Sequence, residues 1–484
     1  MYIFNLNYKL RYDETRLVLI DEYRRGGEEF KGFVHPVYAW IINLFDGKTE
    51  LDKVVDKMVD SLGITQEQAT VVIKPLLEIK ETKYIRYDGI ITTLPADVII
   101  PNKKNEFRER LNDEFFTSVT QPDHACLRLN RPLTLLLCPS LRCYTDCIYC
   151  YADRKYPHVE QNAAFWAALV RQAKQQGIDR IDVTGGEFFM IKDWQQIAAA
   201  LVECGYTPEI STKIPLTEST LDDILKSGLG CVQYSLDTLD TELAVDTLKV
   251  TDSYIDNLLR SIRYADSIGL KVILKPTLCK ATCTEANVRR IIEFADTLAN
   301  VRRVVISTIG FSCYKSRGLY AQIRPNIQQV EELRILIEEL QQGRNYPVID
   351  DSFTYRPHEM QSEKAFNDRA LCTANMDGFV ILPDGKVTIC EELYWHPSFI
   401  IGDCTEKSIT EIWKSEKATR LYFLKESDFP EDSACGKCSI ISTCRTQKGV
   451  CWKLVLAAYG MDKPFHPDPR CTKSGKTDDS FLIP

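Results

Sequence analysis

The sequence contains no long apolar run. Its longest nearly apolar segments, such as Leu133–Cys138, fall far short of the roughly 20 residues that a membrane-spanning helix needs. The segment Met1–Leu10 lacks the charged start and apolar core of a signal peptide. We therefore expect a cytoplasmic protein that makes no use of a membrane.

Positive charge and histidine are also scarce. The 60 Lys and Arg residues are outnumbered by 68 Asp and Glu residues, which gives a net charge of −8. This balance argues against non-specific binding to nucleic acid or to anionic lipid. The 6 histidines are dispersed along the chain and form no metal-binding pattern. The length of 484 residues predicts about three domains, and a hydrophobic share of 44% is ordinary for globular proteins.

Cysteine, by contrast, is abundant. There are 18 cysteines in a chain without an apparent export signal. Cytosolic thiols stay reduced, so this number points to metal ligation or catalysis before disulfides. Eight are scattered, and buried packing is the first expectation for them: Cys126, Cys138, Cys204, Cys231, Cys279, Cys283, Cys313 and Cys404. The other cysteines form two clusters.

Residues 1–100 predict a small module of strands and helices. Tyr2–Tyr12 alternates like a strand, and Arg16–Ile20 reads as another. Apolar residues at helical spacing predict helices over three segments: Val37–Asp46, Glu50–Leu62 and Thr65–Ile79. A hairpin is expected over Lys83–Ile91, with its turn at Asp88-Gly89. This order suggests a winged helix, although a plain packing module is the alternative. A DNA-binding role is disfavoured because acidic residues outnumber basic ones in this stretch.

A charged linker over residues 101–131 leads into a region of alternating strands and helices. Six short buried strands are expected in it: Leu133–Cys138, Ile181–Thr184, Glu209–Ser211, Val232–Leu236, Val272–Leu274 and Val304–Ser307. Repeated βα units imply an α/β fold with a parallel sheet, either open or curled into a partial barrel. Active sites of such sheets lie at the carboxyl ends of the strands. Functional residues are therefore expected just after each of the first four strands.

Three cysteines follow the first of these strands. Cys143, Cys147 and Cys150 have the spacing C-x3-C-x2-C. Three thiolates on one loop suit an iron–sulfur cluster, and three ligands for four irons leave one iron open for catalysis. A zinc site with a fourth ligand such as Cys138 is the alternative.

The second strand ends in Thr184-Gly185-Gly186-Glu187. Glycine lets backbone approach a ligand closely, and a carboxylate at this position can hold an ammonium group. An ordinary turn is the simpler interpretation of these residues taken alone. Their position beside the cysteine loop makes a ligand site the stronger interpretation.

Together these residues resemble the radical S-adenosylmethionine (radical SAM) superfamily. The resemblance rests on Cys143, Cys147 and Cys150, on Tyr149 before the last cysteine, and on Thr184 to Glu187. It implies a partial (βα)6 barrel, one catalytic 4Fe-4S cluster on the three cysteines, and SAM as the source of a deoxyadenosyl radical. An electron donor such as flavodoxin or ferredoxin would be a partner.

The resemblance also implies which residues contact SAM. Thr184, Gly185, Gly186 and Glu187 would hold its amino group, and Tyr149 would lie near the adenine. The later strand ends would line the rest of SAM through four further residues: Ser211, Lys213, Ser235 and Asp237. One departure from the usual pattern is Phe188, which stands where proline is common.

The strand–helix alternation stops near residue 347, and the tail holds seven clustered cysteines: Cys372, Cys390, Cys435, Cys438, Cys444, Cys451 and Cys471. Zinc ribbons also use paired C-x2-C spacing, so the bare pattern is ambiguous. Downstream of a radical SAM core, the pattern resembles the SPASM extension.

That resemblance implies two auxiliary 4Fe-4S clusters. One would be held by Cys435, Cys438, Cys444 and Cys471, and the other by three cysteines: Cys372, Cys390 and Cys451. The fourth ligand of the second cluster is not evident. The candidates are Cys404, which is nearest in sequence, and a thiolate of the substrate.

The first module indicates which class of substrate the enzyme binds. Ile42–Gly47, Val54-Val55 and Pro75–Leu77 resemble the PqqD-like peptide-recognition element of enzymes that modify ribosomal peptides. That element adds a leader peptide as an extra strand. The expected domains are then a recognition element over 1–100, a radical SAM core over 132–346 and a SPASM domain over 347–484.

The function that follows is a peptide maturase with a precursor peptide as partner. Its expected product is an intramolecular cross-link, foremost a cysteine thioether as in sactipeptides and ranthipeptides. Carbon–carbon cyclophane links and an anaerobic sulfatase-type maturase are alternatives among enzymes. A zinc-ribbon regulatory protein is the alternative outside them.

Overall fold

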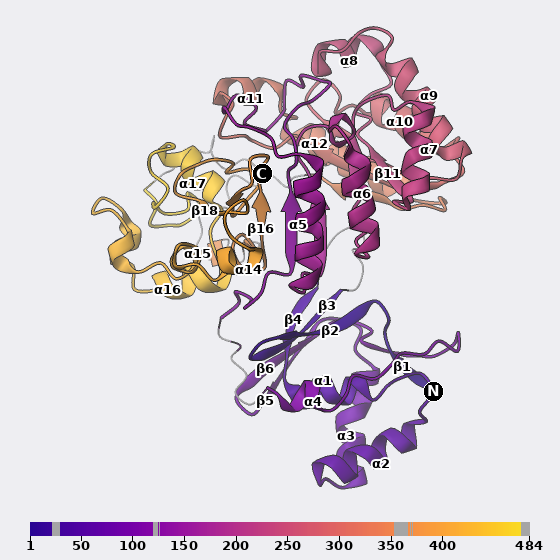
Figure 1. Ribbon diagram of the computed structural model, residues 1–484, viewed down its shortest axis with the longest axis vertical. Helices are drawn as coiled ribbons and strands as arrows, with labels where there is room; N and C mark the ends of the chain where they lie inside the picture. The colour runs from indigo at the N-terminus through magenta and orange to yellow at the C-terminus, as the bar shows by residue number, and fades with distance from the viewer. Residues whose placement is uncertain are drawn as a thin grey trace. The chain divides into compact units, whose positions relative to one another are not determined.

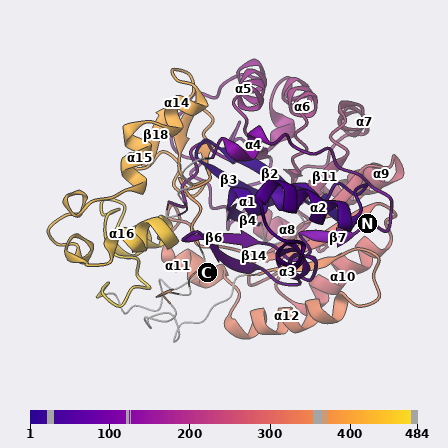
Figure 2. The ribbon, with the colours of Figure 1, turned by 90° about the horizontal axis from the view of Figure 1, so that it is seen from below.

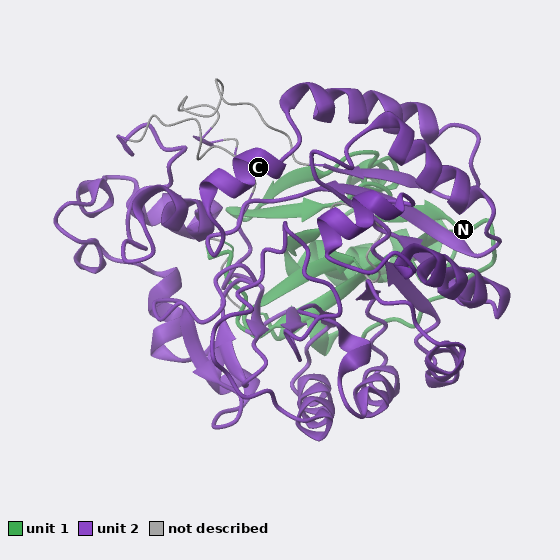
Figure 3. Cartoon of the chain, turned by 90° about the horizontal axis from the view of Figure 1, so that it is seen from above, with its two compact units in different colours: residues 1–130 green, residues 131–484 purple. Residues whose placement is uncertain are grey.

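The structure is a computed structural model that describes residues 1–21, 30–119, 124, 126–352, 366–367, 369 and 371–475. The chain forms two compact units, residues 1–130 and residues 131–484 (Figure 3). The expected boundaries at residues 100 and 346 stay predictions. No helix in the described ranges combines the length and the apolar character needed to cross a bilayer.

The first unit contains three small antiparallel sheets and a group of helices. Its strands are β1 Tyr2–Phe4, β2 Tyr8–Asp13, β3 Arg16–Asp21, β4 Lys31–Val34, β5 Lys83–Tyr87, β6 Ile90–Leu94 and β7 Ile99–Pro101. Its helices are α1 Pro36–Asn43, α2 Leu51–Leu62, α3 Gln66–Leu77 and α4 Glu114–Thr117. The sheets have the orders β2-β3-β4, β5-β6 and β1-β7. Strands, three helices and a hairpin follow one another as expected.

One expected strand of this unit is divided. Tyr2–Tyr12 forms both β1 and β2 because the chain turns after Asn5. The Asn5 side-chain oxygen accepts a hydrogen bond from Asn7 N–H at 3.0 Å, which is the local turn that asparagine favours. β1 then pairs with β7 instead of extending β2.

The helices of the first unit begin and end where their sequences dictate. Pro36 occupies the first turn of α1, and the ring of His35 caps it by accepting from Val37 N–H. Thr65 and Gln68 form a reciprocal capping box at α3. α2 ends at Gly63, whose positive φ of 65° suits glycine.

The second unit contains a partial barrel of six βα units. Its parallel strands are β8 Thr134–Leu137, β9 Arg180–Val183, β10 Ile210–Thr212, β11 Cys231–Tyr234, β12 Lys271–Leu274 and β14 Val301–Thr308. The ladders are parallel within β8-β9 and within β10-β11-β12-β14, and β9 lies beside β10 without a continuous ladder. This confirms the partial (βα)6 barrel.

Helices cover the outside of these strands (Figures 1 and 2). The covering helices are α5 Ala163–Gln175, α6 Trp194–Glu203, α7 Glu218–Ser227, α9 Tyr254–Ser267, α10 Glu285–Asp296 and α12 Ile327–Leu340. Shorter elements complete the barrel region: α8 Thr241–Leu248, β13 Thr277–Leu278 and α11 Arg317–Ile323.

Two strands beyond the barrel extend its sheets. β15 Val348–Asp351 pairs with β14, and β16 Gly378–Ile381 pairs in parallel with β8. A side chain at Gly378 would place its Cβ 2.2 Å from the carbonyl oxygen of Thr134, so this pairing depends on glycine. The sequence did not indicate it, because periodicity identifies a strand but not its partner.

The tail continues from β16 through an antiparallel pair and several short helices. These are β17 Lys386–Thr388, β18 Ile400–Asp403, α14 Ile409–Trp413, α15 Glu416–Tyr422, α16 Ile441–Thr443 and α17 Trp452–Tyr459. Phe379, Ile381 and Trp413 join the same buried cluster as Leu135 and Leu137 of β8. The first part of the tail is thus anchored to the barrel by apolar packing, which the sparse periodicity of the tail did not predict.

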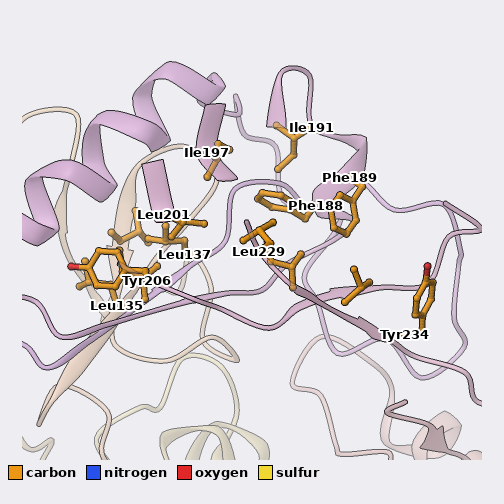
Figure 4. Close-up of a cluster of buried hydrophobic side chains, with 14 of the residues drawn as sticks. Leu135, Leu137, Phe188, Phe189, Ile191, Ile197, Leu201, Tyr206, Leu229 and Tyr234 are labelled. Carbon is orange, nitrogen blue, oxygen red and sulfur yellow. The ribbon is translucent and has the colours of Figure 1, made fainter. Parts of the chain in front are cut away.

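Figure 4 shows part of this buried cluster beside β8. Phe188 and Phe189, which directly follow Glu187, are buried in it. The aromatic residue at the usual proline position therefore anchors the end of the Gly-Gly-Glu segment in the core.

Candidate active site

The three cysteines after β8 lie on one loop at the carboxyl end of that strand, as predicted. Thr145 Oγ1 is 3.5 Å from the sulfur of Cys143 and 3.2 Å from the sulfur of Cys147. Cys150 N–H donates to the carbonyl of Cys147 at 3.1 Å. Burial raises the pKa of the Cys147 thiol, and the nearby charge of Lys213 opposes that shift. The loop thus brings thiols together next to a cation.

The two glycines after β9 pack against this cysteine loop. Gly186 N–H donates to the carbonyl of Ser140, and Glu187 N–H donates to that of Arg142, both at 2.7 Å. A Cβ on Gly186 would lie 2.0 Å from the Arg142 oxygen, and Gly185 has a φ of 116°. The glycines therefore permit close contact between two loops, whereas the sequence predicted that they let the backbone approach a ligand. Their effect is to fix Glu187 beside the cysteines.

Glu187 is a buried carboxylate, with a relative exposure of 1%. It accepts hydrogen bonds from Thr212 Oγ1 at 3.0 Å, Lys213 N–H at 3.1 Å and Phe189 N–H at 3.3 Å. Burial raises its pKa to about 7, against the opposing effect of these hydrogen bonds. Such a carboxyl group is suited to accept a hydrogen bond from a ligand amino group.

Asp237 connects two other predicted SAM-contacting residues, Lys213 and Tyr149. Its Oδ2 lies 2.8 Å from Lys213 Nζ and also accepts from the hydroxyl of Tyr149. Its Oδ1 accepts from Thr277 N–H at 2.8 Å. Lys213 is half-buried, and although burial lowers its pKa, Asp237 and the thiol of Cys147 raise it overall. The lysine remains a cation beside the cysteine loop.

The two predicted serines have a more peripheral place. Ser211 belongs to β10, and Ser235 N–H donates to the carbonyl of Thr212 at 2.9 Å. Lys213 Nζ lies 3.5 Å from the Ser235 carbonyl. The structure thus joins Tyr149, Lys213 and Asp237 directly and places the serines on the adjoining strand ends. Contact of all these residues with SAM stays a prediction.

The tail supplies a carboxylate to this site that the sequence did not predict. Glu391 Oε2 accepts from Tyr151 OH at 3.2 Å and from Thr184 Oγ1 at 3.3 Å. Burial raises the pKa of Glu391, and the nearby charge of Glu392 raises it further. The only signal in the sequence was its position directly after Cys390.

Three of the four cysteines predicted to hold one auxiliary cluster lie beside cationic side chains. Arg445 Nη2 donates to the sulfur of Cys435 at 3.3 Å, and Arg369 Nη2 donates to that of Cys444 at 3.4 Å. The remaining two cysteines are Cys438, which accepts from Lys473 Nζ at 3.4 Å, and Cys471, whose pKa is raised by burial and by the charges of Cys444 and Cys435.

Arg445 itself fits an absent anionic group. It is buried, and its Nε and Nη1 have no hydrogen-bond partner within the described part of the chain. It also lines a pocket together with Cys372 and Trp452. Unsatisfied guanidinium donors beside thiols suit a cluster whose thiolates carry negative charge.

The other tail cysteines are brought together by a second set of contacts. Cys372 N–H donates to the carbonyl of Lys448 at 3.0 Å, and Lys448 lies three residues before Cys451. Burial and the charge of the Cys451 thiol raise the pKa of Cys372 to about 12. Burial also raises the pKa of Cys390, with a smaller contribution from Cys372. Cys372, Cys390 and Cys451 therefore form one neighbourhood.

Cys404 does not belong to that neighbourhood. Its N–H donates to the carbonyl of Gly385 at 2.8 Å, at the far end of β17 from Cys390. Among the described residues, no group of three His, Cys, Asp or Glu side chains is close enough to hold a single metal ion. The assignment of clusters to these cysteines stays a prediction that their grouping supports.

Comparison with known proteins identifies two domains. Residues 137–295 match the radical SAM superfamily, and residues 372–439 match SPASM, an iron–sulfur cluster-binding domain. The PqqA peptide cyclase of Rhizobium meliloti (strain 1021) is 24% identical over 301 residues, covering 61% of this chain and 77% of that protein. A probable GTP 3',8-cyclase of Methanopyrus kandleri is 28% identical over 173 residues, covering 35% of this chain and 54% of that protein.

A solved structure shares the fold over nearly the whole length. Streptococcus suis SuiB bound to the precursor peptide SuiA matches with a TM-score of 0.60 and 16% identity, covering 97% of this chain and 99% of that one. With the cysteine loop, the Gly-Gly-Glu segment and the barrel in place, these matches lead to one conclusion: the chain is a radical SAM enzyme whose core is followed by a SPASM iron–sulfur cluster-binding domain.

Proposed function

We propose that this enzyme is a maturase of a ribosomally synthesised peptide and installs an intramolecular cross-link. The observation that carries the proposal is the likeness to SuiB, which at 97% of the chain must include both compact units. The SuiB structure contains a precursor peptide, and the PqqA peptide cyclases are named for a peptide. A non-catalytic zinc-ribbon protein is set aside by the match to the radical SAM superfamily.

The first unit would provide peptide recognition. Its sheet β2-β3-β4 followed by α1 to α3 has the element order expected of a peptide-recognition element. A leader peptide bound as an added strand gains affinity from main-chain hydrogen bonds and selectivity from side-chain pockets. The leader would bind to this unit, and the segment after it would be modified at the barrel.

The second unit would provide the reaction. A 4Fe-4S cluster on Cys143, Cys147 and Cys150, with SAM bound, would supply the radical that abstracts a substrate hydrogen. Glu187 would accept a hydrogen bond from the SAM amino group through an oxygen that is already aligned by Thr212 and Lys213 N–H. Burial of these groups excludes water from the reacting atoms. A flavodoxin or ferredoxin would deliver the electron.

The link proposed first is a thioether between a cysteine sulfur and a carbon of the same peptide. Its formation removes one hydrogen from the thiol and one from the carbon. A carbon–carbon link is the second candidate, favoured by the match to peptide cyclases. Both links remove two hydrogens, so mass alone does not separate them.

The experiment is co-expression with a short cysteine-containing precursor encoded beside the gene, followed by thiol alkylation and mass spectrometry. Loss of two hydrogens together with a cysteine that can no longer be alkylated supports the thioether. The same loss with all cysteines still alkylated supports a carbon–carbon link. If the peptide is unchanged while the enzyme still cleaves SAM, that peptide is not the substrate. A precursor without its leader is the control for leader recognition.

A further inference from the structure

The auxiliary site predicted around Cys372, Cys390 and Cys451 would have three cysteines for four irons. Either a fourth side chain completes it, or one iron stays open to a substrate thiolate. The first possibility makes the cluster an electron carrier, and the second makes it a substrate-binding site. The identity of the fourth ligand of this cluster therefore determines how the tail takes part in catalysis.

We propose that Cys313 is the fourth protein ligand of this auxiliary cluster. Cys313 follows β14 in the loop that leads to α11. Its thiol donates a hydrogen bond to the carbonyl of Lys453 at 3.4 Å, and Lys453 is two residues after Cys451. A thiol from the barrel thus lies against the segment that carries one of the three cysteines.

Lys453 also holds the Cys313 loop next to the segment that carries Cys390. Lys453 Nζ donates to the carbonyl of Phe311 at 3.3 Å and pairs with Glu392 at 2.7 Å. Glu392 is two residues after Cys390, and Phe311 is two residues before Cys313. One half-buried side chain therefore joins the Cys313 loop to the segments of both Cys451 and Cys390.

The electrostatics agree with this geometry. Burial raises the pKa of the Cys313 thiol to about 12; Lys453 opposes the shift, and the charges of Glu392 and Cys451 add to it. The two thiols therefore lie within electrostatic range of one another. Binding to iron would remove the cost of the buried thiolate, since a metal-bound thiol is deprotonated.

Cys404, the candidate nearest in sequence, is placed wrongly for this role. It pairs with Gly385 at one end of β17, whereas Cys390 lies beyond the other end. Among the described residues, burial and the charge of Asp403 raise the pKa of Cys404 and no thiol contributes, whereas the Cys451 thiol contributes to the raised pKa of Cys313.

The position of Cys313 also links the two ends of the electron path. Ser312 Oγ donates to the carbonyl of Tyr151 at 2.8 Å, and Tyr151 directly follows Cys150 of the catalytic loop. The Ser312-Cys313 segment thus contacts Tyr151, directly after the catalytic cysteines, on one side and Lys453, two residues after Cys451, on the other. With Cys313 bound, no iron of this cluster is open to the substrate.

The test uses the full chain with its catalytic cysteines replaced by alanine, so that only the auxiliary clusters contribute to the spectra. Cys313→Ala is compared with Cys404→Ala and with Cys283→Ala, which removes another buried thiol. The measurements are iron per chain and the electron paramagnetic resonance spectrum of the reduced protein, with and without added dithiothreitol.

We expect Cys313→Ala alone to lose one cluster's iron or to acquire a signal that changes on adding dithiothreitol. Unchanged iron and spectrum in Cys313→Ala would overturn the proposal, as would a change in Cys404→Ala instead. If Cys313→Ala does not fold, the measurement is made on the protein that keeps Cys313. Its auxiliary-cluster spectrum should not change on adding dithiothreitol if every iron has a protein ligand. A change on adding the thiol would overturn the proposal. These readouts need no peptide, so they are independent of the proposed substrate.

Discussion

Glu391 and Thr184 share a hydrogen bond of 3.3 Å between a carboxylate of the tail and a hydroxyl of the Thr-Gly-Gly-Glu segment. The same Glu391 oxygen accepts from Tyr151 at 3.2 Å. The side chain directly after one predicted auxiliary ligand therefore orients residues at the predicted SAM site. The relationship connects the two cysteine regions through a single half-buried carboxylate.

Replacing Glu391 should weaken SAM binding. Glu391→Ala leaves the Thr184 and Tyr151 hydroxyls without their acceptor, at a cost of about 1.5 kcal/mol or more, which corresponds to roughly tenfold in affinity. Glu391→Gln keeps an acceptor oxygen and should lose less than about threefold. Anaerobic equilibrium dialysis with SAM on the reconstituted enzyme measures both. Equal affinities for Glu391→Ala and the unchanged enzyme would show that the contact does not position SAM-binding residues.

Replacing Gly186 should disrupt the catalytic cysteine loop. In Gly186→Ala the new Cβ would lie 2.0 Å from the Arg142 carbonyl oxygen, so one of the two loops must move. Overpacking of this kind costs about 1–3 kcal/mol, and the displaced loop should lose its iron. Iron per chain and visible absorbance after reconstitution measure the loss.

Gly318→Ala is the matched control, because a Cβ at Gly318 meets no atom within 4 Å. It should retain its full iron content. If Gly186→Ala also retains full iron and stability, the close packing of the two loops is not what holds the cysteines.

The parts of the fold that the sequence predicted are those encoded by local periodicity. The six barrel strands and the helices of the first unit appear where alternation and helical spacing placed them. The pairing of β16 with β8 and the contact of Glu391 with Thr184 join residues more than 200 positions apart, which no local pattern encodes. The same limit applies to Cys404, whose nearness in sequence to Cys390 does not become nearness in space.

Stability should depend on pH through Glu187. Its pKa is about 7 in the folded enzyme against 4.5 as the ordinary value, so the folded state keeps a proton that the unfolded state releases. The free energy of unfolding should therefore fall as the pH rises from 4.5 to about 7, by about 3 kcal/mol in total, and then level off.

Glu187→Gln cannot ionise and should lack this component. Relative to the unchanged enzyme, it should become more stable on going from pH 5 to pH 8. Anaerobic denaturant unfolding without SAM measures the difference, with the exposed Glu406→Gln as control. Parallel pH curves for Glu187→Gln and the unchanged enzyme would contradict a raised pKa at this position.

Removing the cation of Arg445 should change the reduction potential of the auxiliary cluster predicted at Cys435, Cys438, Cys444 and Cys471. The Arg445 guanidinium donates to the Cys435 sulfur and is buried beside it. Reduction adds negative charge, which a nearby buried cation stabilises, so Arg445→Met should lower the potential. A tenfold effect on the one-electron equilibrium corresponds to about 59 mV.

The control for Arg445 is Arg420→Met, which removes an exposed arginine paired with Asp428 elsewhere in the tail. A redox titration followed by electron paramagnetic resonance, in the background without catalytic cysteines, should show a lowered potential only for Arg445→Met. Equal potentials in the two variants would mean that Arg445 supports packing and does not act on a cluster at these thiols.

Leader recognition should depend on the first unit and not on exposed apolar surface in general. Val71 of α3 is an apolar side chain with a relative exposure of 68%, and Ile335 of α12 in the second unit has 69%. If a leader peptide covers α3, Val71→Asp places a charge in the interface and should weaken binding about tenfold, whereas Ile335→Asp should not. Fluorescence anisotropy of a labelled leader on the full chain measures both. A loss of affinity with Ile335→Asp alone would locate leader binding in the second unit and remove the reason for assigning recognition to the first.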